Sequence, residues 1–182
     1  KICSHRNFAK LVIYTNGTIV PRENCLTACK DNRVIFLISN YGKLLSKRVD
    51  ALIKALDKHN IQYLNERITT WQDCAKIEDK KRSQADNYSV FSNCCVNDTL
   101  SLLHGRIYGC PFAGHADNLG AIPDNADDYV DVSVSNQELR RRLASLTSGT
   151  QVLKACEFCN GRDYTVANVE AAVQSAEVLE YI

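Results

Sequence analysis

The chain has 182 residues, 22 of them basic and 21 acidic, so its formal net charge is +1. Nucleic acids and anionic membranes select basic surfaces, so this balance argues against either as the main partner. Hydrophobic residues make up 45% of the chain, which is enough for a packed core in one large domain or two small ones. The sequence contains no run of about 18 apolar residues, so no membrane-spanning helix is expected.

The chain begins with Lys1 and contains no methionine. We interpret it as a piece of a longer protein in preference to a chain from which a leader has been removed. Residues 1–10 contain no apolar stretch of the signal-peptide type, so no secretory leader is expected within the chain.

The first 75 residues alternate between strand and helix patterns. Leu11–Tyr14 and Arg33–Ile38 are continuous apolar runs of the kind that buried parallel strands require. A short helix is predicted between them, over Arg22–Lys30. The first strand is expected to end in the turn Thr15-Asn16-Gly17 and the second at Ser39.

An amphipathic helix is predicted over Ser46–His59, because its apolar residues recur at i, i+3, i+4 and i+7 from Val49. Ile61–Ile68 is predicted as a third strand. This β-α-β-α-β order is typical of a parallel sheet with helices packed on it. The sequence therefore predicts an α/β fold for this part of the chain.

The character of the sequence changes after Thr70, and we place a domain boundary between residues 75 and 76, giving domains 1–75 and 76–182. Glu78–Asn87 is charged and polar, and is expected to form a linker or an exposed loop.

The second domain is expected to contain a few short elements. Leu100–Tyr108 has the pattern of a hairpin around His104-Gly105, and Pro111–Pro123 is expected to be a loop. Glu138–Leu146 is predicted as a short amphipathic helix, and Ala167–Glu180 as the last helix.

Cysteine content is high for a chain of this length. The nine cysteines are Cys3, Cys25, Cys29, Cys74, Cys94, Cys95, Cys110, Cys156 and Cys159. Asn-x-Ser/Thr triplets at Asn16, Asn87 and Asn97 are compatible with a secreted, disulfide-bonded protein. The odd number of cysteines and the adequate core favour a reducing compartment, hence a cytoplasmic location, with thiolates that bind metal.

The most specific pattern is Cys156-x-x-Cys159 together with two cysteines that flank the predicted hairpin, Cys95 and Cys110. Two thiolates separated by two residues can bind one metal from a single turn, and a second pair must complete the four-coordination. Cys94 fits the spacing as well as Cys95 does, and we prefer Cys95. Spacing alone allows structural zinc, an iron–sulfur cluster, or buried cysteines without a metal.

Several segments resemble the radical S-adenosylmethionine (radical SAM) enzymes. Tyr14–Thr18, with its Thr-Asn-Gly, and Arg33–Ser39 resemble the third and fourth strands of the partial barrel of that family. Cys95–Cys110, with Gly105-x4-Cys110, resembles the start of the C-terminal twitch/SPASM extension. Cys156-x-x-Cys159 is similar to the closing cysteine pair of the twitch form. The resemblance covers most of the chain.

This resemblance implies a fold and cofactors. The fold would be the C-terminal half of a partial parallel (β/α) barrel, followed by a small α+β twitch-like iron–sulfur domain. Cys95, Cys110, Cys156 and Cys159, with Cys94 as the alternative to Cys95, would bind an auxiliary [4Fe–4S] cluster. Thr15, Asn16, Gly17 and Ser39 would lie near S-adenosyl-L-methionine. The parent enzyme would use a reductant such as flavodoxin or ferredoxin to cleave that cofactor, and would abstract hydrogen from an unknown small-molecule or peptide substrate.

One departure from the family concerns activity. The defining C-x3-C-x2-C motif is absent: Cys25-x3-Cys29 begins like it, but position 32 is Asn. In the family this motif follows the first barrel strand, so it would lie before Lys1. The chain alone is therefore expected to be inactive as a radical SAM enzyme. The alternative is a non-enzymatic module with a structural zinc site made of four cysteines.

Overall fold

The structure is a computed structural model that describes residues 7–31, 33–73, 76–161, 166–174 and 176. It has a mixed α/β architecture, as the sequence predicted. The N-terminal unit contains the chain up to Trp71 together with Val169–Gln174, and the C-terminal unit is built mainly from Gln72–Asn168. Within the described residues, no helix has the length and apolar character needed to cross a membrane.

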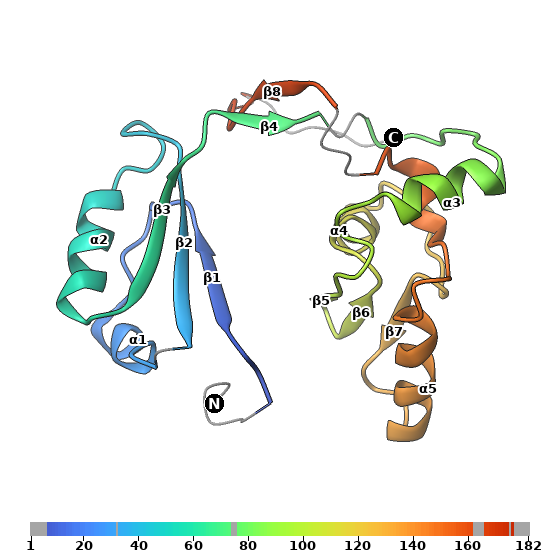
Figure 1. Cartoon of the computed structure of the whole chain (residues 1–182), viewed down its shortest axis with the longest axis horizontal. Helices are drawn as coiled ribbons and strands as arrows, with labels where there is room; N and C mark the ends of the chain where they lie inside the picture. Colours follow the sequence, from blue (N-terminus) through green and yellow to red (C-terminus); the bar gives the residue numbers. More distant parts are fainter. Residues whose placement is uncertain (1–6, 32, 74–75, 162–165, 175, 177–182) are drawn as a thin grey trace. The chain divides into compact units, whose positions relative to one another are not determined.

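The N-terminal unit is organised around a three-stranded parallel sheet (Figure 1). Its strands, in spatial order, are β1 (Leu11–Thr15), β2 (Val34–Asn40) and β3 (Gln62–Arg67). The register places Phe36 of the central strand between Ile13 and Tyr63. All three strands were predicted, β1 and β2 from their apolar runs, and their C-terminal ends meet at one edge of the sheet because they are parallel.

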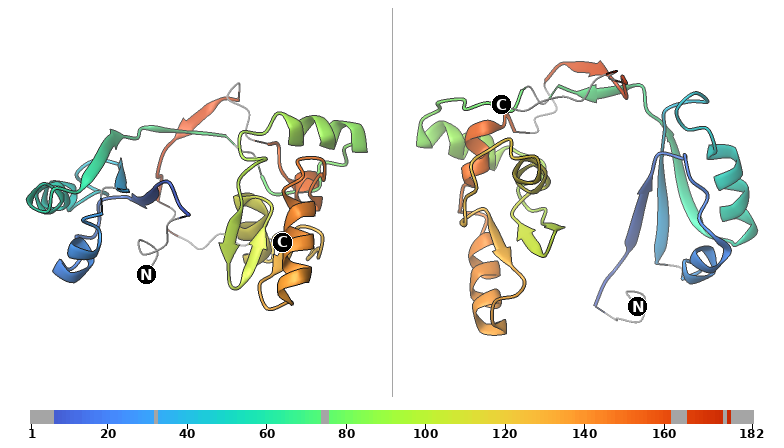
Figure 2. Two further views of the ribbon diagram at one scale, coloured as in Figure 1. Left: turned by 60° about the horizontal axis from the view of Figure 1, so that its bottom comes forward. Right: turned by 180° about the vertical axis from the view of Figure 1, so that it is seen from behind.

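Two helices cover one face of this sheet (Figure 2). They are α1 (Glu23–Ala28) and α2 (Val49–Lys58), and they pack against the face of β2 that carries Val34, Phe36 and Ile38. Leu52 and Leu56 of α2 are completely buried there. Each such side chain contributes roughly 1.5–3 kcal/mol on leaving water, so the predicted apolar stripe of α2 forms a large part of this core.

The C-terminal unit combines short helices with a small antiparallel sheet. Its described elements are α3 (Gln84–Ser92), β5 (Ser101–Leu103), β6 (Arg106–Tyr108), α4 (Pro111–Asn118), β7 (Tyr129–Asp131), α5 (Asn136–Leu146) and the 3₁₀ helix η2 (Lys154–Phe158). The short strands β4 (Thr70–Gln72) and β8 (Asn168–Glu170) belong mainly to the N-terminal unit. Strands β5, β6 and β7 form an antiparallel sheet in that order, and β4 pairs with β8.

The predicted hairpin is confirmed as β5 and β6. His104 and Gly105 connect the two strands, and both have positive φ, at 49° and 80°. Two successive residues with positive φ are typical of the tight turn whose twist matches that of paired strands. The hairpin leads directly from β6 to Cys110.

Three sequence predictions in the C-terminal half were wrong. Pro111–Pro123, expected to be a loop, begins with α4, because Pro at the first helical position is preorganised for a helix. Glu78–Asn87, expected to be a linker, contains the capped start of α3, where Ser83 Oγ accepts the N–H of Asp86 at 3.2 Å. The described part of the predicted helix Ala167–Glu180 contains β8 instead, and residues 175 and 177–180 lie outside the described residues.

Candidate metal centre

Four cysteines from three segments of the C-terminal unit line one cavity. They are Cys94, Cys110, Cys156 and Cys159, and the cavity volume is about 220 Å³. The remaining lining is mainly apolar and includes Val90, Phe91, Val96, Pro111, Phe112, Leu153 and Ala155. Four thiols therefore share a cavity with several times the volume of one water molecule, about 30 Å³.

The two adjacent cysteines differ in their placement. Cys94 follows α3, donates its N–H to the carbonyl of Phe91 at 3.1 Å, and lines the cavity. Cys95 is exposed and does not line it. The structure thus groups Cys94, rather than the preferred Cys95, with Cys110 and the Cys156-x-x-Cys159 pair.

Cys110 sits at the junction of β6 and α4. It is the N-cap of α4, and its Sγ accepts a hydrogen bond from the N–H of Ala113 at 3.3 Å. Hydrogen bonds from backbone N–H groups to cysteine sulfur are one of the means by which proteins tune thiolate ligands. The sulfur is therefore fixed at a helix start, where a backbone donor already faces it.

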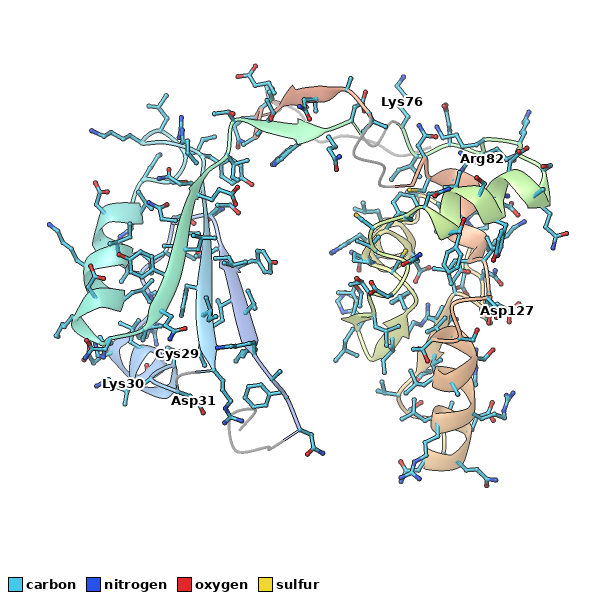
Figure 3. All side chains as sticks on the ribbon, in the orientation of Figure 1. Cys29, Lys30, Asp31, Lys76, Arg82 and Asp127 are labelled. Carbon is cyan, nitrogen blue, oxygen red and sulfur yellow. The ribbon has the colours of Figure 1, made fainter. Side chains whose placement is uncertain are left out.

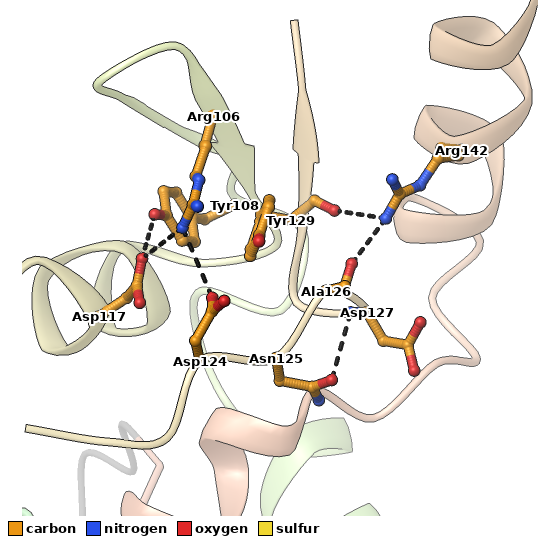
Figure 4. A network of polar contacts seen from close by, with 9 residues as sticks. All are labelled: Arg106, Tyr108, Asp117, Asp124, Asn125, Ala126, Asp127, Tyr129 and Arg142. Atoms are coloured by element: carbon orange, nitrogen blue, oxygen red, sulfur yellow. Dashed lines mark hydrogen bonds and ion pairs between the residues drawn. The ribbon is translucent and has the colours of Figure 1, made fainter. Parts of the chain in front are cut away.

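A polar network fixes the strand before Cys110 to the helix after it (Figure 4). Tyr108 of β6 donates its hydroxyl hydrogen to Asp117 Oδ2 of α4 at 2.5 Å, and Arg106 Nη1 donates to the same oxygen at 3.2 Å. The Arg106 guanidinium also lies 4.1 Å from the centre of the Tyr129 ring. These contacts connect β6 to α4 and so define the position of Cys110 between them.

The Cys-x-x-Cys segment is held by a buried carboxylate. Asp128 is only 4% exposed, and its two oxygens accept the N–H groups of Lys154 and Ala155 at 2.6 and 2.8 Å. These are N–H groups of the first turn of η2, which have no acceptor within the helix itself. Asp128 therefore anchors the short helix that carries Cys156.

A glycine shapes the turn after Cys159. The N–H of Gly161 donates to Cys159 Sγ at 3.3 Å, and Gly161 has a φ of +73°, in the left-handed region. A Cβ at this position would lie 3.0 Å from a methyl group of Val90. Only glycine adopts this left-handed conformation without strain, and in it the N–H of residue 161 points at the sulfur.

Burial changes the ionisation of two of these thiols. It raises the pKa of Cys110 to about 11, with a further contribution from the neighbouring Cys159 and Cys94. Burial likewise raises the pKa of Cys156 to about 12, with Cys110 as the next largest cause. Because metal ligands must be thiolates, metal binding here would release protons.

Alkylation of the metal-free protein should reflect this burial. At a pH of about 7.5 we expect iodoacetamide to modify Cys110 and Cys156 at least about tenfold more slowly than the exposed Cys95, because the thiolate is the reactive form. Their rates should rise as the pH approaches the raised pKa values. Peptide mass spectrometry at neutral and alkaline pH measures the three rates, and equal rates at neutral pH would contradict the partly buried placement of Cys110 and Cys156.

Other features bear on metal binding and secretion. In the described part of the chain, no three His, Cys, Asp or Glu side chains converge closely enough to share one metal ion, and no disulfide joins two of the described cysteines.

Two of the Asn-x-Ser/Thr asparagines make contacts within the fold. Asn87 is only 5% exposed, and Asn97 Nδ2 donates to the carbonyls of Phe91 and Ser92, each at 3.3 Å. These two Asn-x-Ser/Thr asparagines are therefore engaged within the fold.

A second candidate site lies at the strand ends of the N-terminal unit. Thr15, Asn16 and Ser39 line an open hollow together with Tyr14 and Tyr41. The structure therefore brings three of the four residues predicted to lie near a cofactor to one place, at the carboxyl edge of a parallel sheet, where such folds bind ligands.

Local hydrogen bonds also explain this turn. Asn16 Oδ1 accepts the N–H and the hydroxyl hydrogen of Thr18 at 3.2 and 2.7 Å, and Thr15 Oγ1 accepts the N–H of Gly17 at 3.3 Å. Gly17 is buried and does not line the hollow; its φ is +71°, and a Cβ there would lie 3.1 Å from Val49. Gly17 therefore has a structural role in the turn.

Two residues that sequence reasoning missed complete the cysteine site, Arg82 and Asp128. Arg82 Nη2 donates to the carbonyls of both Cys156 and Cys159. The Ser83-x-x-Asp86 helix start was a signal that the segment is structured, but nothing in the sequence links either residue to cysteines further along the chain.

No protein-family model matches the chain, and a search of curated proteins finds no significant match.

Proposed function

We propose that this chain is part of a radical SAM enzyme and that its C-terminal unit binds an auxiliary [4Fe–4S] cluster through Cys94, Cys110, Cys156 and Cys159. One observation carries the proposal: four cysteines, contributed by three separate segments, line a single apolar cavity. Cysteine thiolates are the usual ligands of such clusters, with one cysteine for each iron.

The donor set fits this group. Two of the sulfurs, those of Cys110 and Cys159, already accept backbone N–H groups. The apolar lining, to which Phe91 and Phe112 contribute, would limit water access to a bound cluster. When bound, the cluster would supply an electron-accepting centre or a binding site for substrate, while the residues of the chain hold it and keep water out.

Cavity size favours a cluster over a single ion. Zinc draws its sulfurs to about 2.3 Å around one point, so it needs almost no empty volume. A four-iron cluster takes one thiolate at each iron and spreads the sulfurs around a larger body. The cavity of about 220 Å³ meets the second requirement more closely.

The finer fold belongs to the same proposal. The three-stranded parallel sheet with α1 and α2 on one face would be the end of a partial (β/α) barrel, and the C-terminal unit would be the twitch-like domain. The hollow lined by Thr15, Asn16 and Ser39 would lie near S-adenosyl-L-methionine in the complete enzyme. A reductant such as flavodoxin or ferredoxin would be the electron donor. The chain lacks the C-x3-C-x2-C motif, so we do not expect it to cleave that cofactor by itself.

Metal analysis of the whole chain tests the proposal. After anaerobic purification and reconstitution, we expect about four irons and four sulfides per chain and a broad absorption band that bleaches on reduction. One zinc per chain without sulfide would refute the cluster and support the alternative, a non-enzymatic module with a structural zinc site made of four cysteines. Absence of any metal together with paired thiols would support the secreted disulfide protein.

A further inference from the structure

Arg82 lies just before α3 (Figure 3). It contacts the Cys-x-x-Cys segment, which is far from it in the sequence. Its Nη2 donates to the carbonyl oxygen of Cys156 at 2.6 Å and to that of Cys159. Its Nη1 lies 3.5 Å from Asn160 Oδ1. One guanidinium therefore binds the carbonyl oxygens of both cysteines of the motif.

The segment before α3 is built to present this side chain. Lys81 has a positive φ of 49°, stabilised by a hydrogen bond from its N–H to Asp79 Oδ1 at 2.8 Å. A non-glycine residue in this conformation is uncommon and persists only where its surroundings determine it. The N–H of Lys80 also donates to the carbonyl of Glu157 at 2.9 Å. The segment before α3 therefore contacts the cysteine turn through the backbone of Lys80 and the side chain of Arg82.

Arg82 is itself oriented by a buried partner. Its Nε donates to Asn87 Oδ1 at 3.0 Å, and Asn87 is only 5% exposed on α3. Because Nε fixes the guanidinium on one side, Nη2 can bind the two carbonyls with little further loss of side-chain freedom. The arrangement thus connects α3, which is followed by Cys94, to the segment carrying Cys156 and Cys159.

The charge of Arg82 has no carboxylate partner within ion-pair distance among the described residues. Its hydrogen bonds there go to neutral oxygens, two from peptides and two from side-chain amides. A group bound by four thiolates becomes more negative when it is reduced, so a nearby cation favours the reduced form.

We infer that Arg82 is a positioning residue that orders the Cys156-x-x-Cys159 turn and raises the reduction potential of the group bound there. This inference rests on the cluster proposed above, and it adds a residue outside the ligand set that governs electron uptake. Lys80 and Asn87 support the same function by holding the Arg82 segment in place.

Two substitutions separate ordering from charge. Arg82→Gln removes the charge, whereas Arg82→Lys keeps the charge but loses the planar group whose Nε and Nη1 contact Asn87 and Asn160. Arg140→Gln is the matched control, because Arg140 is exposed on α5 and its replacement changes the net charge equally. Each variant of the whole chain is assayed metal-free by hydrogen exchange over residues 154–161, and reconstituted by a redox titration followed by electron paramagnetic resonance.

We expect faster exchange in both Arg82 variants. We also expect a more negative potential in Arg82→Gln, with the reduced fraction falling about tenfold relative to the oxidised one at a fixed potential, which is about 59 mV for a one-electron couple. Arg82→Lys should stay near the wild-type potential. If the wild-type chain forms the cluster but both Arg82 variants match Arg140→Gln in exchange and potential, the role of Arg82 is overturned alone. A wild-type chain without iron and sulfide overturns the cluster proposal and this inference together.

Discussion

Replacing Cys94 with alanine is expected to remove most of the iron from the reconstituted chain, whereas Cys95→Ala should leave the iron content unchanged. Cys94 lines the cavity with the other three cysteines, and Cys95 is exposed outside it. Loss of a residue that only supports a metal ligand weakens metal binding by about 10–100-fold, so loss of a ligand should weaken it at least as much.

The two cysteines are adjacent and chemically identical, so each variant controls for the other. Iron and sulfide per chain, measured after identical reconstitution, give the comparison, and thermal unfolding of the metal-free proteins checks that both fold. The reverse result, with iron lost in Cys95→Ala and kept in Cys94→Ala, would show that the site uses the exposed cysteine and that the segment after α3 rearranges on binding.

Replacing Asp128 with alanine is expected to destabilise the C-terminal unit by about 2 kcal/mol, because two N–H groups at the start of η2 lose their acceptor. Ala155 is almost completely buried, so water cannot readily replace the carboxylate at its N–H. Burial raises the pKa of Asp128, and its hydrogen bonds to Ala155 and Lys154 oppose that rise. The substitution also removes the cost of burying the carboxylate. The expected loss of stability is therefore smaller than the sum of two hydrogen bonds to a charged group.

Denaturant unfolding of the metal-free chain, followed by a probe in the C-terminal unit, measures this loss. Asp127→Ala is the matched control, because Asp127 is the neighbouring residue and is exposed. We expect it to change the free energy of unfolding by less than about 0.5 kcal/mol. Equal effects of the two substitutions would contradict the anchoring role of Asp128.

The main elements of the N-terminal unit were predictable because their apolar residues occur either in continuous runs or at helical spacing. The apolar runs at Leu11–Tyr14 and Arg33–Ile38 appear as β1 and β2, and the stripe starting at Val49 appears as α2. The wrong predictions fall where no such period exists. Helix α3 buries only Asn87 and Phe91, and α4 buries small residues such as Ala113 and Ala116, so neither has an apolar stripe in its sequence.

The site was predictable in its cysteines but not in its supports. The Cys-x-x-Cys pair needs a second pair for four-coordination, and the predicted hairpin indicated Cys110 together with Cys95 or Cys94 as that pair. The choice between Cys94 and Cys95 depends on how the chain leaves α3, which a one-residue difference in spacing does not reveal. Arg82 and Asp128 contact residues 74 and 26 positions away through backbone atoms, and such contacts leave no pattern in the sequence.

The distribution of the cavity-lining cysteines along the chain has a consequence for how the proposed cluster would be assembled. Cys110 lies 16 positions after Cys94, and Cys156 lies 46 positions after Cys110, whereas Cys156 and Cys159 are neighbours in one turn. Closing a loop costs more entropy as it lengthens, by about 0.6 kcal/mol for each doubling. The cluster proposed above would therefore be captured first by the neighbouring pair, with Cys110 and Cys94 joining afterwards. Once bound by all four cysteines, the proposed cluster would cross-link the three segments that carry them.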